Sequence, residues 1–466
     1  MTDQAITASQ SLGTPLPRAT IIRYRLAYGI GAIGYAAGLQ VVNVLLLRFM
    51  TDDLAIAASV AGTLLAITRL FDAVSDPLVG YMSDRTRTPW GRRRPYLIVG
   101  AIVLPLTVFG LFNPPEITGM TLAAYMLGLL IVHGLAYTAF VVPYTAVGAE
   151  ILDDYHERST LMSFRVYGGS LGLLVAATIA PWLLAAWGGG RSAHGNMGLS
   201  LAFIIMVCCL ISGFCLAERK PTDKFRKPMP VREYIQLAFA SGAFGRILIV
   251  HIVFQIGVAT VVVSTAYFSR YVLQVSDYWL GTFYLAKVAG NLISVPFWLW
   301  IARSIDKPKA YIASLAIYGL LNLTWLLSGP DEAMTLVVGR MFLVGIGMGG
   351  AVLLAYSLLA DLIRYDQIKT GLDREGMFSG SVTFIDKTSA AIGTAGIGFL
   401  LSAMGYVAGS ADTVSQPDTA IAAIYAGFCV VPGIAALLCI AAMRSYPLTR
   451  EVVEQAAALE LQKTAD

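Results

Sequence analysis

Two aspartates lie one helical turn apart in a stretch that is otherwise apolar enough to cross a membrane. Asp72 and Asp76 occupy this stretch, which runs from residue 60 to 82, and Arg69 precedes Asp72 by three residues. At helical spacing the three side chains share one face. Carboxylates at bilayer depth are costly, and where they occur they usually carry ions or protons.

One arginine cannot neutralise two aspartates. The trio has a formal charge of −1, which a bound Na⁺ or a proton would cancel. The alternative is a buried structural ion network of the kind that packed helices also keep. The unbalanced charge favours cation binding over that alternative.

The composition indicates a helical protein that crosses the membrane many times. Hydrophobic residues make up 57% of the 466 residues and charged residues only 13%. Apolar runs of helix-spanning length recur along the chain, without the alternation typical of a membrane barrel. We expect twelve spans, centred near residues 35, 68, 103, 132, 174, 206, 257, 290, 318, 347, 391 and 430.

Basic residues predict the orientation, because they are kept on the cytoplasmic side. Arginines and lysines concentrate in the loops over 85–94 and 219–232 and are scarce in the alternate loops. Even-to-odd loops and both termini are therefore expected in the cytoplasm. This bias accounts for the net charge of +4, so no nucleic-acid partner is expected.

The chain divides into two similar halves. The basic stretch at its midpoint separates six spans from six, which predicts an N-terminal bundle over 1–217, a cytoplasmic linker over 218–243, and a C-terminal bundle with a cytoplasmic tail over 244–466. Asp84-Arg85 after the second span is echoed by Asp306-Lys307 after the eighth. Parallel six-helix repeats with a binding site between them are typical of major facilitator transporters.

One segment carries a family resemblance. FDAVSDPLVG over 71–80, followed by DRTR over 84–87 and WGRRRP over 90–95, resembles the glycoside–pentoside–hexuronide:cation symporter family. Val142-Pro143-Tyr144 and the basic residues Arg165 and Lys387 extend the similarity over nearly the whole chain. The resemblance implies the major facilitator fold and symport of a sugar-like molecule with a cation.

The resemblance also implies a cation site. Asp72, Asp76 and Thr138 match family positions that bind the coupling cation, and Ser75 stands where the family has an amide. A hydroxyl can still bind Na⁺, but the replacement favours H⁺, and both ions stay open. Arg69, Arg165 and Lys387 form the expected charge network; no other cofactor or metal is expected.

The substrate side departs from the family. Its two sugar-gripping acids correspond to Ala36 and Val141, so a galactoside is not expected. The basic groups that remain either favour an anionic hexuronide or only balance the aspartates. The substrate residues that we expect are Tyr35, Tyr137, Tyr144, Arg165, Lys387 and Tyr356, with Gln40 and Asn43 as further polar lining. Whether the charged Lys287 and Asp386 line the cavity is open.

The loop after the second span has its own mechanical interpretation. Gly80 permits close helix contact, and Asp84, Arg85 and Arg92 can pair across the cytoplasmic ends of neighbouring helices. Breaking such pairs would serve as a gate in alternating access. The alternative is that the arginines only set the topology.

These features favour a secondary transporter, acting as a monomer in the lipid bilayer on a small, sugar-like molecule. A transporter of an amphipathic, lysolipid-like molecule is the alternative on the same fold. A membrane enzyme is less consistent with the sequence, which contains no nucleophile–base pair, metal motif or cofactor motif. The loops are too short for a typical receptor, and a passive channel would not need the charge cluster.

Overall fold

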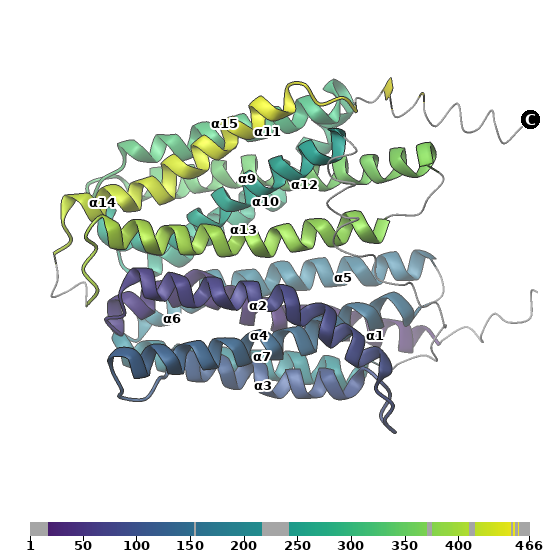
Figure 1. Cartoon of the computed structure of the whole chain (residues 1–466), viewed down its shortest axis with the longest axis horizontal. Helices are drawn as coiled ribbons and strands as arrows, with labels where there is room; N and C mark the ends of the chain where they lie inside the picture. Colours follow the sequence, from purple (N-terminus) through teal and green to yellow (C-terminus); the bar gives the residue numbers. More distant parts are fainter. Residues whose placement is uncertain are drawn as a thin grey trace, which may run out of the picture.

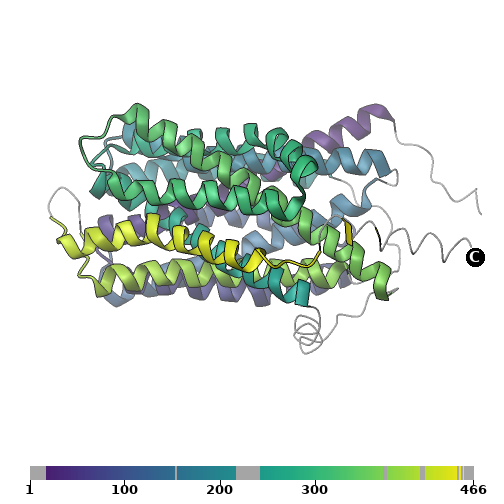
Figure 2. The same ribbon diagram turned by 90° about the horizontal axis from the view of Figure 1, so that it is seen from above.

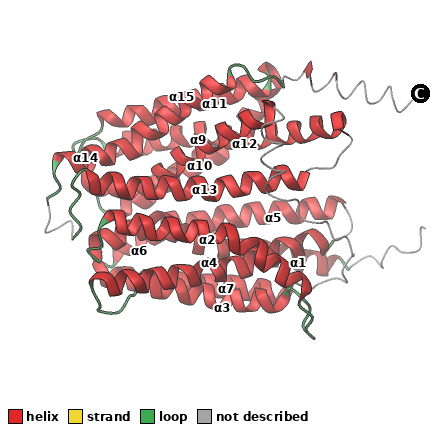
Figure 3. Cartoon of the chain, in the orientation of Figure 1, coloured by secondary structure: helices red, strands yellow, loops and turns green. Residues whose placement is uncertain are grey.

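A computed structural model describes residues 17–152, 155–216, 242–370, 375–409, 415–448, 451–452 and 455. Every regular element in these ranges is a helix (Figure 3). Most of the linker expected over 218–243 lies outside the described residues, as does the end of the tail.

The N-terminal half consists of long helices joined by short loops. They are α1 (Arg18–Val41), which continues through the π-helical turn η2 (Val42–Leu46), α2 (Ala58–Arg85), α3 (Arg94–Phe112), α4 (Gly119–Glu150), α5 (Tyr155–Leu174), α6 (Ala180–Ala186) and α7 (Gly190–Cys215). The turn η3 (Phe49–Asp53) lies between α1 and α2, and η4 (Val175–Ile179) joins α5 to α6.

The C-terminal half repeats this pattern. Its helices are α9 (Gly242–Tyr267), α10 (Asp277–Ile305), α11 (Lys307–Leu323), α12 (Met334–Thr370), α13 (Glu375–Ala403), α14 (Asp418–Tyr425) and α15 (Val431–Met443). Short turns extend three of them, namely η5 (Phe268–Val272), η6 (Thr324–Leu327) and η7 (Ala426–Val430).

Eleven helical segments in the described part of the chain are long and apolar enough to span a membrane. The remaining predicted span, centred near residue 391, is α13, a helix of 29 residues that carries Asp386 and Lys387 within it. The prediction of an all-helical membrane protein of about twelve helices is therefore confirmed.

The two halves lie side by side, with their helices running in the same general direction (Figures 1 and 2). α2 of the first half packs along α13 of the second, and α6 packs against α10. The start of α1 and the end of α15 lie at the same end of the molecule (Figure 1). The positive-inside pattern assigns that end to the cytoplasm.

A pair of glycines brings α2 and α13 into backbone contact near the extracellular end. A Cβ atom on Gly398 would lie 2.5 Å from the carbonyl oxygen of Ala58, and a Cβ on Gly62 would lie 3.0 Å from Cα of Gly398. Small residues allow such close approach of helices in membranes. This contact holds the halves together on the extracellular side of the centre.

We predict that Gly398→Ala opens this end. The added methyl group overpacks the α2–α13 contact at a cost of about 1–3 kcal/mol, which raises the population of extracellularly open molecules about fivefold or more. Spin labels at the exposed Met120 and Leu327, one in each half, would report the longer distance by electron paramagnetic resonance, after replacement of the native cysteines.

Gly396→Ala is the matched control, because a Cβ there meets nothing within 4 Å. Unchanged label distances in Gly398→Ala, or equal changes in both variants, would show that the glycine contact does not determine how far the extracellular end is closed.

Candidate functional site

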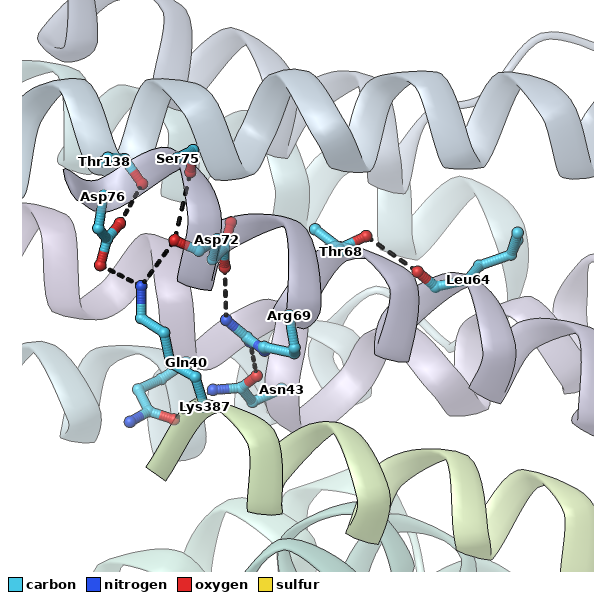
Figure 4. A network of polar contacts seen from close by, with 10 residues as sticks. All are labelled: Gln40, Asn43, Leu64, Thr68, Arg69, Asp72, Ser75, Asp76, Thr138 and Lys387. Carbon is cyan, nitrogen blue, oxygen red and sulfur yellow. Dashed lines mark hydrogen bonds and ion pairs between the residues drawn. The ribbon is translucent and has the colours of Figure 1, made fainter. Parts of the chain in front are cut away.

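The centre of the molecule holds an ion pair between the two halves. Lys387 extends from α13 to α2, where its ammonium binds the carboxylate of Asp76 (Figure 4). The same Nζ donates to the backbone carbonyl of Asp72 at 3.3 Å. This contact joins residues that are 311 positions apart in the chain.

Thr138 and Arg69 complete the cluster from the N-terminal half. The Thr138 hydroxyl on α4 donates to Oδ1 of Asp76 at 2.7 Å. Arg69 lies 3.5 Å from Oδ2 of Asp72 and also donates to the side chain of Asn43 (Figure 4). α2 therefore carries both aspartates, while α4, η2 and α13 supply their neighbours.

Lys387 changes the charge expected from the sequence. With Arg69 and Lys387 opposite Asp72 and Asp76, the four-residue cluster is formally neutral. The formal charge of −1 counted for Arg69, Asp72 and Asp76 was incomplete, because the second positive charge, on Lys387, comes from the other half. In this conformation Lys387 therefore balances the charge of Asp76. This agrees with the second interpretation of the basic residues, in which they balance the aspartates.

Asp72 keeps one buried acceptor unused. The residue is only 3% exposed, and its Oδ1 has no hydrogen-bond partner among the described residues. Gly134 on α4 makes room for it, since a Cβ there would collide with Oδ1. A buried carboxylate oxygen without a donor is unfavourable, so the site can gain from a proton or a cation.

Ser75 does not point its hydroxyl at the carboxylates. The residue is buried, and its Oγ donates to the backbone carbonyl of Asp72 at 3.3 Å (Figure 4). The structure thus brings Asp72, Asp76 and Thr138 together as side-chain oxygens, with Ser75 directed at the backbone beside them.

A cavity of about 290 Å³ adjoins the cluster and lies between the two halves. The N-terminal half contributes Leu39, Gln40, Asn43, Arg69, Asp72 and Tyr137 to its wall, and the C-terminal half contributes Gln255, Val258, Ala259, Val262, Val263, Asp386, Lys387, Ala390 and Thr394. A larger hollow of about 690 Å³ lies near the extracellular end, but it is formed by the C-terminal half alone. The first cavity is therefore lined by charged side chains and has walls from both halves.

Tyr137, Tyr35 and Arg165, three of the expected substrate residues, contact one another in that order, beginning at the wall of this cavity. Tyr137 lines it, and Tyr35 lies edge-on to Tyr137 with ring centroids 6.1 Å apart. Arg165 then donates through Nε to the Tyr35 hydroxyl at 3.3 Å. Arg165 therefore stands behind the tyrosines, while Lys387 is in the wall itself.

The other two tyrosines are placed elsewhere. Tyr144 is fully buried, stacks on Tyr28 with centroids 4.3 Å apart, and donates to the Tyr28 carbonyl. Tyr356 is half-exposed and lies against His251 beside a separate, very small cavity. Tyr144 therefore packs α1 against α4, and neither ring faces the central cavity in this conformation.

Asp386 lines the cavity, whereas Lys287 lies beside a small separate cavity within the C-terminal half. Oδ1 of Asp386 accepts hydrogen bonds from Nε2 of His251 at 2.6 Å and Nε2 of Gln255 at 2.8 Å. Gln255 is a functional residue that the sequence analysis does not predict, and the same holds for this contact. The signal was the i, i+4 spacing of His251 and Gln255, which places two donors on one face of α9.

The residues expected to form a cytoplasmic gate tie together helices of the N-terminal half. Asp84 pairs with Arg93 at 2.8 Å, and Arg92 pairs with Glu150 at 2.9 Å. Two others make looser contacts: Arg85 lies over the Tyr81 ring, and a Cβ on Gly80 would meet Val142 at an ordinary 3.4 Å. A role in gating stays a prediction.

The extracellular end is closed by polar contacts between the halves. Three residues of the η3 region make them: Arg48 pairs with Asp277 at 2.6 Å, the Thr51 hydroxyl lies 2.8 Å from that of Tyr267, and Asp52 accepts from Tyr406 at 2.5 Å. Together with the glycine contact, they join the two halves at the extracellular end.

Asp53 in the same segment is a titratable part of this closure. Burial raises its pKa from the ordinary 3.8 to about 6, against the lowering effect of the Arg48 charge. The charged and titratable groups around it are Arg48, Asp52, His194, Arg270 and Asp277. A closed extracellular end therefore holds a proton at Asp53 more tightly than an open, hydrated one.

This helical fold, with a charge cluster between two halves, defines a secondary transporter of the major facilitator type. The chain belongs to the MFS/sugar transport protein family, whose model matches residues 27–450. The resemblance to glycoside–pentoside–hexuronide symporters is thereby confirmed, and the protein is a multi-pass membrane transporter of the sugar type rather than an enzyme.

Individual relatives agree with this assignment. The chain is 32% identical to the isoprimeverose transporter of Lactiplantibacillus pentosus over 419 residues, which cover 88% of this chain and 85% of the relative. It is 25% identical to the inner membrane symporter YicJ of Escherichia coli strain K12 over 450 residues, which cover 94% and 95% of the two chains.

The fold is also similar to that of a bacterial homologue of the human drug peptide transporters PepT1 and PepT2. That comparison has a TM-score of 0.66 at 15% identity and covers 96% of this chain and all of the other. At this identity the likeness concerns the fold alone.

We predict that acidification from about pH 6 to pH 4 stabilises the closed extracellular end. Asp53 has a raised pKa when closed and an ordinary one when hydrated, so closure gains stability as pH falls through about 6. A difference of about two pKa units corresponds to about 3 kcal/mol. The distance between spin labels at Met120 and Leu327 measures the change.

Asp53→Asn is the test variant, and its label distances should respond to pH less than those of the wild type, because Asp52, whose pKa burial also raises, remains. A pH response that persists unchanged in Asp53→Asn would assign the titration to another group.

Proposed function

We propose that the protein is a cation-coupled symporter of a glycoside, pentoside or hexuronide that works by alternating access. Asp72 and Asp76, with Thr138 and Ser75 beside them, take up H⁺ or Na⁺, and the substrate binds in the adjoining cavity. The observation that carries the proposal is the contact of Lys387 with Asp76 across the two halves, next to the unpartnered oxygen of Asp72.

Lys387 stands where a coupling cation would bind. Its ammonium is surrounded by the carboxylate of Asp76 and the carbonyl oxygen of Asp72, and Thr138 donates to the same carboxylate. A cation at Asp76, or a proton that neutralises it, removes the attraction for Lys387. Lys387 then turns toward the cavity that it already lines.

This exchange supplies a physical basis for coupling. The cation releases a hydrogen-bond donor into the substrate site, and a substrate that binds this donor keeps it away from Asp76. Each ligand therefore favours binding of the other, which is the requirement for symport. Because the contact joins the two halves, its release also lowers the barrier to movement of one half relative to the other.

The ligand set favours H⁺ over Na⁺. Sodium needs several oxygen ligands directed at one point, and the hydroxyl of Ser75 is directed at a backbone carbonyl instead. A proton needs only one carboxylate, and on Asp76 it removes the charge that holds Lys387.

The cavity wall favours a hydroxyl-rich substrate. Gln40, Asn43, Gln255 and Asp386 give it hydrogen-bonding groups on both sides, which an acyl chain would leave unpaired. The isoprimeverose transporter among the relatives supports a sugar, and the lysolipid-like alternative has no comparable support. Both walls belong to one chain, which is consistent with a working monomer.

We predict that Asp76→Asn abolishes coupling while leaving exchange. The variant cannot take up the coupling proton or cation, so accumulation of substrate against a gradient should fall about 5- to 150-fold, the range of typical coupling energies. Counterflow of the same substrate between equal concentrations should persist. Proteoliposomes with a glycoside panel, assayed with and without Na⁺, provide both measurements.

Glu116→Gln is a matched control, since it removes an exposed carboxylate outside the helices. Full gradient-driven accumulation by Asp76→Asn would contradict the proposed cation site. Accumulation that requires Na⁺ at every pH would overturn the preference for H⁺.

A further inference from the structure

Asp386 is a third cavity carboxylate that the cation mechanism does not use. Asp386 lies on α13, immediately before Lys387 in the sequence. Its side chain contacts α9, whereas that of Lys387 contacts α2. His251 and Gln255 both donate to the same oxygen, Oδ1, at 2.6 and 2.8 Å. Two donors on one oxygen fix the orientation of the carboxylate.

The second oxygen of this carboxylate is available. Oδ2 of Asp386 has no hydrogen-bond partner among the described residues, and the side chain is 29% exposed. Both Asp386 and Gln255 line the 290 Å³ cavity between the halves. An oriented carboxylate with one open oxygen is a strong acceptor for ligand hydroxyl groups.

The opposite wall provides donors. Asn43 donates its amide to Oε1 of Gln40 at 3.2 Å, so Gln40 keeps its own NH₂ group for other partners. Lys387 adds an ammonium once it leaves Asp76. Sugar hydroxyls both donate and accept, and they would find Asp386 on one side and these donors on the other.

The charges around the cavity disfavour an anion. Asp72, Asp76 and Asp386 face Arg69 and Lys387, which gives these five side chains a formal sum of −1. One bound H⁺ or Na⁺ makes this sum zero. A uronate would restore the negative charge and bring its carboxylate close to Asp386.

We infer that Asp386 is a specificity-determining residue, which accepts hydrogen bonds from hydroxyl groups of an uncharged glycoside or pentoside and selects against hexuronides. His251 and Gln255 are its positioning residues. This inference rests on the proposed sugar symport and narrows its substrate class. Ala36 and Val141 stand where the related symporters have sugar-binding acids in the N-terminal half, and here Asp386 would supply such an acid from the C-terminal half.

The test is equilibrium binding to the purified full-length protein in detergent, without gradients. The probes are isoprimeverose, methyl β-D-xylopyranoside and D-glucuronate. The wild type should bind at least one neutral probe more tightly than glucuronate. Asp386→Asn should weaken neutral binding about 10- to 100-fold, the loss expected for a hydrogen bond to a charged group, and should narrow or reverse the preference over glucuronate.

Gln255→Ala should weaken neutral binding less than Asp386→Asn, because it leaves the acceptor in place but loosens its orientation. Asp418→Asn is the matched control, an exposed carboxylate at the start of α14 that should bind like the wild type. Binding of the coupling ion, followed by proton uptake or ²²Na⁺ binding, should be unchanged in Asp386→Asn, which also shows that the variant is folded.

Three results would overturn the inference: wild type that prefers glucuronate or binds neither neutral probe, neutral binding that is unaffected in Asp386→Asn, and a variant that loses ion uptake with sugar binding intact. The last would make Asp386 a cation carrier. Failure of coupling at Asp76 would instead appear in gradient-driven transport and in the effect of H⁺ and Na⁺ on sugar affinity, with the preference for neutral sugars intact, so the two failures are distinguishable.

Discussion

Buried carboxylates have to be neutralised, and in this protein the neutralising charge of one of them belongs to the other half of the molecule. Asp72 has Arg69 on its own helix, but Asp76 depends on Lys387 of α13. Any cation that replaces Lys387 therefore acts on the contact between the halves as well as on the carboxylate. In the mechanism we propose, electrostatic neutralisation and relative movement of the halves are parts of one event, which is what a coupled transporter requires.

The two ends of the molecule differ in how their polar groups are used. At the extracellular end, Arg48 and Asp52 reach partners in the second half, so opening must break these contacts. At the cytoplasmic end, the pairs of Asp84 and Arg92 lie within the first half. The cavity lies between these regions, where Asp386 adds an acceptor to a site whose cation cluster is already balanced.

Local patterns in the sequence predicted the spans and placed Asp72 and Asp76 on one helix face, because apolar runs and helical spacing depend on near neighbours. Thr138, which lies on another helix, was expected only from the family resemblance. Contacts between the halves were not predictable in this way. The partner of Asp76 lies 311 residues away, and the hydrogen bonds of Asp386 depend on how α9 and α13 are rotated. The same rotation places the ring of Tyr144 in helix packing, although its residue type alone is equally suited to a sugar.

The central claim is that a cation and a substrate reinforce each other's binding through Lys387. The most direct measurement is the dissociation constant of isoprimeverose for the wild-type protein over a grid of pH and Na⁺ concentration. We predict that the affinity for isoprimeverose increases as H⁺ saturates the aspartates, or as Na⁺ does if Na⁺ is the coupling ion, and that Asp76→Asn removes this dependence. A dissociation constant that is the same across the whole grid, in a protein that binds the sugar, would contradict it.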